Sequence, residues 1–471
     1  MTDEPLFPPL PHAMRPRGEA AVADAQLQGF LHHATLTKDD GRRERMQETF
    51  GARADDVREL AGRIKQHTLD HLDSYLERFV ACAEAAGARV HFARDAEQAN
   101  EVAVSIANEV GAKLCVKSKS MVTEETRLLP ALEEAGCTTV ETDLGEFILQ
   151  LDGDAPSHIV TPMIHKDRAA VARAFARELD APYTEDPAEL TRIARNHLRE
   201  RYRNADLGIC GANFLVADSG TVVICTNEGN GRFCTSAPPT LIVFAGIEKL
   251  VPREEHLGVL LKVLARSSTA QPLTCYTHLM TGPRRPDEPD GPQRMDIVLI
   301  DNGRTQLLRQ PTRDLLRCIR CGACLNACPV YRCVGGHSYG AVYSGPIGAV
   351  LTPLLKGLAN YADLPHASSL CGACLEACPV RIDLPRHLVR LRAEMVKQRI
   401  TRWRERLWMR IWARMLQRTW TYRVGAWIQR RLLRGWVERA PGPLAAWTRD
   451  RDLPGPAPRS FRTWWRQNRG R

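Results

Sequence analysis

Seven cysteines between residues 318 and 378 have the spacing of ligands to iron–sulfur clusters. The first run follows the pattern C-x2-C-x2-C-x3-C-P and reads Cys318-Ile-Arg-Cys321-Gly-Ala-Cys324-Leu-Asn-Ala-Cys328-Pro329. In ferredoxins with this pattern, three thiolates bind one [4Fe–4S] cluster and the fourth reaches a neighbouring cluster. A zinc site needs only two C-x2-C pairs and gives no role to the fourth cysteine or the proline. The run therefore predicts iron–sulfur rather than structural zinc.

A second run repeats the last three cysteines and reads Cys371-Gly-Ala-Cys374-Leu-Glu-Ala-Cys378-Pro379. The ligand exchange of ferredoxins assigns Cys318, Cys321, Cys324 and Cys378 to cluster I, and Cys328, Cys371 and Cys374 to cluster II. The fourth ligand of cluster II stays open: Ser368 or water, Cys333, or a three-iron cluster. Because the runs exchange ligands, we expect two adjacent [4Fe–4S] clusters that relay electrons, with a structural or regulatory cluster as the alternative.

The remaining sequence favours a reducing compartment. The amino terminus lacks the basic-then-apolar order of a secretory signal, so the expected location is the cytoplasm, where thiols stay reduced. No apolar run approaches the roughly 18 residues of a membrane span. Seven further cysteines are scattered singly and are expected in the core: Cys82, Cys115, Cys137, Cys210, Cys225, Cys234 and Cys275.

Residues 66–305 alternate between helical and strand periodicity, which is typical of an α/β domain with a parallel sheet. Strands are predicted at 89–93, 113–116, 138–140, 207–210, 214–217, 221–224, 241–244 and 295–300, and helices at about 68–86, 97–111 and 124–135. The tripeptide Asp218-Ser219-Gly220 predicts a hairpin turn. No G-x-G-x-x-G follows a predicted strand, so a Rossmann-type nicotinamide or flavin site is not supported.

Three further regions flank this domain. Residues 1–65 are interpreted as an N-terminal arm, 306–398 as a mainly helical two-cluster ferredoxin-type domain, and 399–471 as a helical C-terminal region.

Residues 401–471 hold 18 arginines, no lysine, four acids and all nine tryptophans, a net charge of +14 within a chain of +10. Apolar residues on one face of 403–416 and arginines on the other predict a basic amphipathic helix. We favour a partner subunit as its target over an anionic membrane surface, nucleic acid or this protein's own body.

Lys117, Lys119 and Ser120 form a candidate anion site. They precede a predicted helix with Thr123 as its N-cap, and cations beside free helix N–H groups attract carboxylate or phosphate. An ordinary capped helix with solvated lysines is the alternative. His158 and His165 are interpreted as packed or surface residues rather than catalysts.

Two segments carry a resemblance to a known family. The run from Gly208 to Asn230 resembles the signature of the lactate-utilisation (LUD) domain, and the segment from Lys117 to Glu125 matches its other recognisable stretch. With the paired cysteine runs and the ending from Trp447 to Trp464, the chain is similar to LutB-type iron–sulfur proteins from about residue 65 onward.

The resemblance implies an α/β fold similar to ribose-5-phosphate isomerases and CoA transferases. It also implies one subunit of a three-protein system that oxidises L-lactate to pyruvate, carrying electrons through two [4Fe–4S] clusters on the same seven cysteines. A component for another 2-hydroxy acid, such as glycolate, is an alternative. A second alternative is that the LUD domain is itself a catalyst on a carboxylate or acyl substrate. Its basis is Glu228-Gly229-Asn230, which is similar to the Glu-Asn-Gly-like turn of CoA transferases but has the residues in a different order. A third alternative is a scaffold for partner subunits.

Overall fold

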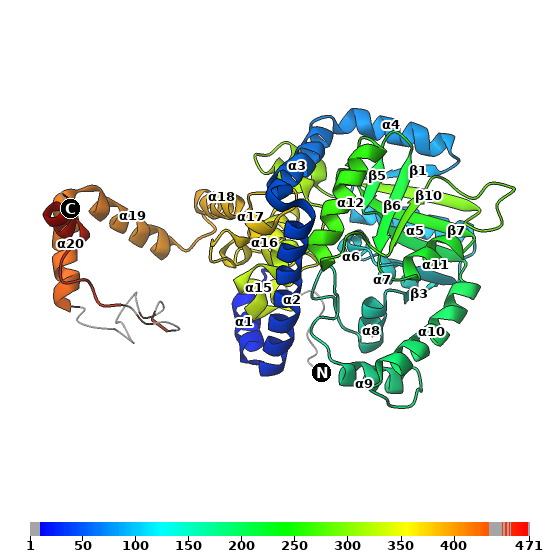
Figure 1. The fold of residues 1–471 in the computed structure, drawn as a ribbon, viewed down its shortest axis with the longest axis horizontal. Helices are drawn as coiled ribbons and strands as arrows, with labels where there is room; N and C mark the ends of the chain where they lie inside the picture. The colour runs from blue at the N-terminus through cyan, green and yellow to red at the C-terminus, as the bar shows by residue number, and fades with distance from the viewer. Residues whose placement is uncertain (1–9, 433–444, 446–447, 450–451, 453, 470–471) are drawn as a thin grey trace. The chain divides into compact units, whose positions relative to one another are not determined.

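The computed structural model describes residues 10–432, 445, 448–449, 452 and 454–469 (Figure 1). The chain forms two compact units, Met1–Glu394 and Met395–Arg471. The α/β region and the cysteine-rich region both belong to the first unit.

The central element of the first unit is a six-stranded parallel sheet (Figure 1). Its order is β1-β10-β7-β4-β2-β3, with β1 (Arg89–Ala93), β2 (Leu114–Lys117), β3 (Thr138–Glu141), β4 (Leu207–Gly211), β7 (Thr240–Gly246) and β10 (Arg294–Ile300). Every residue of β7 is buried, because Leu241 and Val243 face one apolar cluster and Ile242 and Phe244 face another. The sheet is thus covered on both faces, which confirms the predicted parallel α/β core.

A smaller sheet of order β8-β5-β6-β9 packs beside it. It contains β5 (Phe214–Val216), β6 (Thr221–Thr226), β8 (Leu250–Val251) and β9 (Tyr276–Met280). The predicted hairpin joins β5 and β6, which pair antiparallel. Gly220 has a φ of +66°, and an added Cβ would lie 2.4 Å from the Ala83 nitrogen, so the turn requires glycine. Strands β8 and β9 were not predicted, since β8 has two residues and β9 is partly exposed.

Two predicted helices are each divided. The segment 68–86 was expected to form one helix. Its first residues instead belong to the end of α3 (Ala54–Asp70), and the rest forms α4 (Leu72–Ala85). The helix expected over 124–135 forms α6 (Met121–Thr126) and α7 (Leu128–Glu134), divided by Arg127 with a φ of +58°. The other helices of the α/β region are α5 (Ala96–Glu109), α8 (Leu144–Asp152), α9 (Arg168–Glu178), α10 (Pro187–Asn204), α11 (Asn230–Ser236), η2 (Ile247–Lys249), α12 (Glu254–Thr269) and α13 (Arg304–Leu308).

The scattered cysteines divide by burial. Cys115, Cys137, Cys210 and Cys234 are buried as expected, and Cys82 and Cys225 are half-buried. Cys275 is exposed, so its placement in the core was wrong. It lies just before the edge strand β9, where one side of the chain faces solvent.

The N-terminal arm is helical and packed on the rest of the unit. It forms α1 (Met14–Ala23), α2 (Ala25–Phe50), η1 (Gly51–Arg53) and the start of α3. Helix α2 packs against α12 and against α15 (Pro329–Val334) of the cysteine-rich region (Figure 1). Asp39 is 1% exposed and pairs with Arg42 and, at 3.2 Å, with Arg332. An unpaired buried carboxylate would be costly, so the pairing of Asp39 with Arg332 helps to hold the arm on the cysteine-rich region.

The cysteine-rich region consists of short helices. They are η3 (Arg313–Arg317), α14 (Ala323–Asn326), α15, η4 (His337–Tyr339), α16 (Gly345–Lys356), η5 (Leu364–His366), α17 (Ala373–Ala377) and α18 (Leu384–Lys397).

The second unit contains α19 (Trp403–Gln417), α20 (Thr419–Leu432) and α21 (Phe461–Asn468). Helix α19 confirms the helix predicted over 403–416. Trp403, Trp408 and Trp412 are 58–63% exposed, and no residue of α19 is buried. None of the helices in the described part of the chain combines the length and the apolar composition that a membrane span requires.

Candidate iron–sulfur site and the adjoining cavity

Both cysteine runs fold into the same local structure. In each, a glycine in the left-handed region precedes a short helix: Gly322 at φ +75° before α14, and Gly372 at φ +87° before α17. An L side chain rarely adopts this φ, which explains glycine at both positions. Cys328 caps α15, whose first residue is Pro329, a position that needs no N–H donor. Helices α14 and α17 pack against each other, so the two runs lie side by side.

Four thiols meet at one cavity. The cavity is lined by Cys318, Cys321, Cys324 and Cys378, together with apolar residues that include Ile159 and Ile347. These are the cysteines predicted for cluster I, and the fourth comes from the second run. Burial raises the pKa of the Cys321 thiol, and the neighbouring Cys378 and Cys318 raise it further. Four thiols around one apolar hollow, two of them buried and two half-buried, fit a [4Fe–4S] cluster, whose iron would take the place of the thiol protons.

The other three cysteines form a second group. Burial raises the pKa of the Cys374 thiol to about 12, with contributions from Cys328 and Cys371. Cys324 is influenced by both groups, because its pKa is raised by burial, by Cys318 and Cys321, and also by Cys374. The two groups are therefore neighbours.

Neither candidate for a fourth ligand of this group is buried. The thiol of Cys333 is exposed on α15. Ser368 is half-buried, and its hydroxyl accepts a hydrogen bond from the Leu370 N–H at 3.1 Å.

A larger cavity of about 330 Å³ adjoins the first. It opens where β2, β4 and β6 end, and Arg320 and Ile159 line both cavities. Ligands in α/β proteins commonly bind at the carboxyl ends of the parallel strands. Its polar lining includes Ser118, Lys119, Ser120, Asp143, Asn213, Glu228, Asn230, Lys249 and Arg320.

The structure divides the candidate anion site. Lys119 and Ser120 line the larger cavity, whereas Lys117 is fully buried among carboxylates, 2.5 Å from Glu141 and 3.2 Å from Glu124. The Lys119 ammonium donates to the Val160 carbonyl at 2.5 Å. The N-cap of α6 is Ser120 and not Thr123, because the Ser120 hydroxyl accepts from the Thr123 N–H. The three residues thus do not converge on one point.

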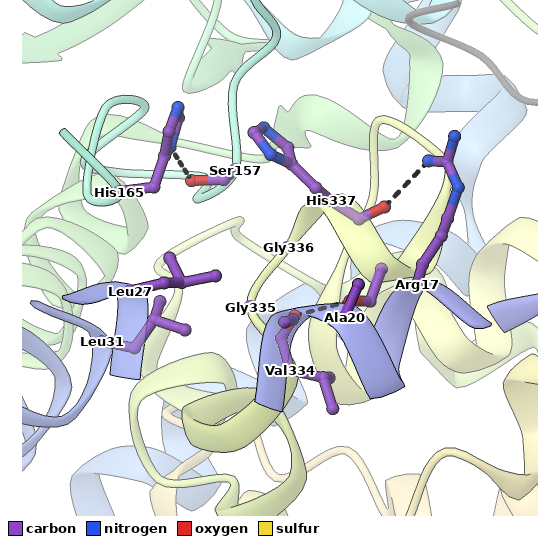
Figure 2. A pocket seen from close by; sticks show the side chains of 12 residues that line it. Arg17, Ala20, Leu27, Leu31, Ser157, His165, Val334, Gly335, Gly336 and His337 are labelled. Carbon is purple, nitrogen blue, oxygen red and sulfur yellow. Dashed lines mark hydrogen bonds between the residues drawn. The ribbon is translucent and has the colours of Figure 1, made fainter. Parts of the chain in front are cut away.

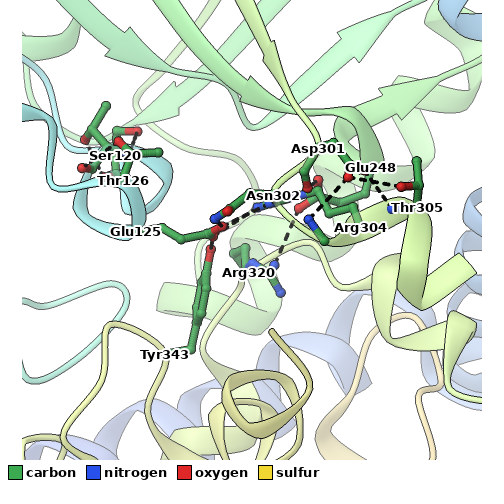
Figure 3. A network of polar contacts seen from close by, with 12 residues as sticks. Ser120, Glu125, Thr126, Glu248, Asp301, Asn302, Arg304, Thr305, Arg320 and Tyr343 are labelled. Atoms are coloured by element: carbon green, nitrogen blue, oxygen red, sulfur yellow. Dashed lines mark hydrogen bonds and ion pairs between the residues drawn. The ribbon is translucent and has the colours of Figure 1, made fainter. Parts of the chain in front are cut away.

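A buried charge network joins the sheet to the first cysteine run (Figure 3). Arg304 pairs with Glu125 at 3.0 Å and with Glu248 at 2.6 Å. Glu248 also lies 3.5 Å from Arg320, whose guanidinium covers the Tyr343 ring at 4.7 Å. Burial alone would raise the pKa of Glu248, but Arg304 and Arg320 outweigh it and lower that pKa to about 2. The two positive charges of Arg304 and Arg320 therefore balance the two negative charges of Glu125 and Glu248.

The two candidate histidines are packed. His158 is 3% exposed; its Nδ1 accepts from the Val160 N–H and its Nε2 donates to Asn326 of α14 at 3.1 Å. Burial lowers the pKa of His158 to about 3, so the ring is neutral. His165 contacts the Ser157 hydroxyl at 2.6 Å (Figure 2). It also contacts the Asp154 carboxylate at 3.0 Å. Both rings lie in the loop between α8 and α9, which contacts the cysteine-rich region through Asn326 and His337.

His165, Asp154 and His337 bring three potential metal-binding atoms within 4.8 Å of one another. Each already has protein partners: Lys166 lies 2.8 Å from Asp154, and His337 contacts the Ala155 carbonyl at 2.8 Å. The group therefore forms a hydrogen-bonded junction beside the pocket of Figure 2.

Sequence reasoning did not select Arg320, Lys249, Glu248, Arg304 or Tyr339 as site residues. The position of Arg320 inside the first cysteine run could have indicated that it lies near the proposed cluster site. Glu248 and Lys249 were visible only as charges that end an apolar run, and nothing in the sequence places them beside residue 320.

Comparison with known proteins defines the class first. Residues 76–300 match the LUD domain and residues 314–382 match a 4Fe-4S dicluster domain. Residues 391–470 match the C-terminal region of lactate utilisation protein B. The chain is thus an iron–sulfur protein with a LUD domain.

Curated relatives identify the family. Lactate utilization protein B of Oceanobacillus iheyensis is 46% identical over 417 residues, which cover 87% of each chain. The protein of the same name from Shouchella clausii is 43% identical and covers 93% of this chain and 94% of its own. A crystal structure of a DUF162 family protein from Deinococcus radiodurans covers 49% of this chain and 98% of its own, at 10% identity and a TM-score of 0.25. The chain belongs to the lactate utilization protein B family.

Proposed function

We propose that this chain is the electron-transfer component of a system that oxidises L-lactate to pyruvate, with two [4Fe–4S] clusters. The observation that carries the proposal is the shared cavity of Cys318, Cys321, Cys324 and Cys378, in which the second run supplies the fourth thiol. Oxidation of a 2-hydroxy acid to a 2-oxo acid releases two electrons, and each cluster accepts and donates one at a time. Two neighbouring clusters therefore match the electron count of this reaction.

The ligand sets are part of the proposal. Cys318, Cys321, Cys324 and Cys378 would hold cluster I, and Cys328, Cys371 and Cys374 would hold cluster II. The influence of both groups on Cys324 supports adjacent clusters, and short separations favour electron relay over a purely structural role.

The sister subunits of the system are the proposed partners. The second unit supports this, because its exposed tryptophans and arginines are the residue types that dominate protein interfaces.

Iron analysis and EPR of anaerobically purified protein test the cluster assignment. We expect about seven to eight irons per chain and the spin-coupled spectrum of two reduced cubanes. Addition of L-lactate with the partner subunits should reduce both clusters. A colourless protein that contains zinc would contradict the proposal.

Matched cysteine variants test the second ligand set. We expect Cys328→Ser to lose the spin-coupled signal and about half of the iron, since Cys328 would bind cluster II. Cys333→Ser is the control: it removes an exposed thiol of the same helix and should leave the iron content unchanged. If Cys333→Ser instead loses cluster II, Cys333 is its fourth ligand.

A further inference from the structure

The larger cavity contains two cationic groups that the protein leaves without a full set of partners. Lys249 is 7% exposed, and its ammonium makes no hydrogen bond or ion pair with the part of the chain that the structure describes. The Arg320 side chain is 9% exposed, and its Nη1 is buried with no hydrogen-bond partner among the described residues. Both side chains line the cavity. A buried cation without a counter-charge is costly, so an anion from outside would complete this site.

The neighbouring acids do not fill that role. Glu248 is engaged by Arg304 at 2.6 Å and approaches Arg320 only at 3.5 Å, through Nη2 rather than Nη1. Because the two glutamates and two arginines of the network balance, Lys249 carries an excess positive charge at the cavity wall.

The other lining acids lie in a different part of the cavity. Asp143 accepts from the Gly145 and Glu146 N–H groups as the N-cap of α8, and the Glu228 carboxylate accepts from the Leu144 N–H at 3.5 Å, so both acids lie at the start of that helix. A ligand with a second anionic group would meet these two carboxylates. The lining therefore favours a small monoanion over a dicarboxylate or a phosphate ester.

We propose that this cavity binds a small monocarboxylate, held by the Lys249 ammonium and the Arg320 guanidinium. The planar guanidinium is suited to a carboxylate, and the ammonium adds a charge-assisted hydrogen bond. The choice of 2-hydroxy and 2-oxo acids as ligands rests on the proposed function, whereas the cation pair does not. Of the candidate anion site, Lys119 and Ser120 line the same cavity, whereas Lys117 is enclosed by carboxylates and does not reach it.

The position of Arg320 couples this site to the cysteines. It lies between Cys318 and Cys321 in the chain, has a φ of +59°, and lines both cavities. A carboxylate bound to Arg320 adds negative charge beside the first group of thiols, which disfavours an added electron there. Ligand binding should therefore lower the reduction potential of the cluster held by that group.

Calorimetry on the full-length, anaerobic, cluster-loaded protein tests the site. The probes are L-lactate and pyruvate, with succinate and inorganic phosphate as comparison anions. We expect the monocarboxylates to bind more tightly than either comparison anion. Lys249→Met should weaken them about tenfold or more, the effect of losing one charge-assisted hydrogen bond. The matched control Lys262→Met removes an exposed lysine of α12 and should bind as the parent does.

Arg320→Lys provides a second variant that keeps the charge but loses the planar fork, and it should also weaken binding. Redox titration of the parent protein gives a further readout. Saturating pyruvate should lower the reduction potential of the cluster held by the first group of thiols. Equal affinity in the parent and Lys249→Met, or no binding to the parent, would overturn the inference. Iron content and EPR are measured on the same samples. If the parent protein contains two intact clusters but binds no monocarboxylate, the carboxylate site is rejected, whereas the proposed electron-transfer function is not.

Discussion

Tyr339 is a buried side chain that lies near both groups of thiols. It is fully buried, and its hydroxyl has no hydrogen-bond partner among the described residues. Burial raises the pKa of this hydroxyl, and Cys328, Cys324 and Cys374 raise it further, so it faces both groups. A cluster sulfur would supply the missing acceptor, and hydrogen bonds to sulfur raise cluster potentials.

We expect Tyr339→Phe to lower the potential of one cluster by about 40 mV, which corresponds to about 1 kcal/mol for a one-electron couple. Redox titration followed by EPR measures this shift. Tyr331→Phe is the matched control, because the Tyr331 hydroxyl already donates to the Ser157 carbonyl at 2.7 Å. Equal potentials in all three proteins would show that Tyr339 does not contact a cluster.

His158 should make stability depend on pH. Its folded pKa of about 3 lies below the usual value of 6.5 because of burial, so the unfolded state binds the proton first as pH falls. Stability from this group is complete above pH 6.5 and decreases by about 1.4 kcal/mol per pH unit between 6.5 and 3. Thermal midpoints of cluster-loaded protein at pH 7.5, 6.5 and 5.5 should show this decrease.

His158→Gln removes the titrating ring, so the thermal midpoint of the variant should fall less between pH 6.5 and 5.5 than that of the parent. The variant should nevertheless be less stable than the parent at pH 7.5. An unchanged slope in the variant would assign the pH dependence to other groups.

At the scale of elements, close backbone approaches hold the loop of residues 154–165 against the cysteine-rich region. A Cβ on Gly336 would lie 1.7 Å from the Ser157 carbonyl oxygen, which no side-chain movement can relieve. Gly336→Ala should therefore destabilise the protein by about 1–3 kcal/mol or more, as overpacking does. Thermal denaturation measures the change.

Gly258→Ala is the matched control, since it lies in α12 and an added Cβ meets nothing within 4 Å. That variant should be as stable as the parent or slightly more so, by about 0.4–1 kcal/mol. If Gly336→Ala matches it, the loop is not held in this position.

At the scale of the whole molecule, the second unit should be separable from the clusters. All seven proposed ligands lie in Met1–Glu394. Deletion of residues 401–471 should therefore leave iron content and EPR unchanged, while binding to the partner subunits is lost. Co-purification with those subunits measures binding, and a variant that keeps full partner binding would contradict the docking role of this unit.

The sequence alone determined the parallel α/β core, which the structure confirms, and it predicted the proposed cysteine ligand sets. Metal-ligand spacing depends on residues close in the chain, and buried parallel strands appear as continuous apolar runs, so both signals are local. The basic helix of 403–416 was visible for the same reason. Short or edge strands such as β8 and β9 carry too few residues for a pattern, and the break at Arg127 depends on one left-handed residue.

Only the tertiary structure decided how residues distant in sequence meet. Lys117, Lys119 and Ser120 are adjacent in the chain, yet the first lies among carboxylates and the other two line a cavity. Lys249 and Arg320 are 71 positions apart and line the same cavity. The charges and burial that surround an ionisable group come from several elements at once, because electrostatic energy depends on distance in space rather than along the chain.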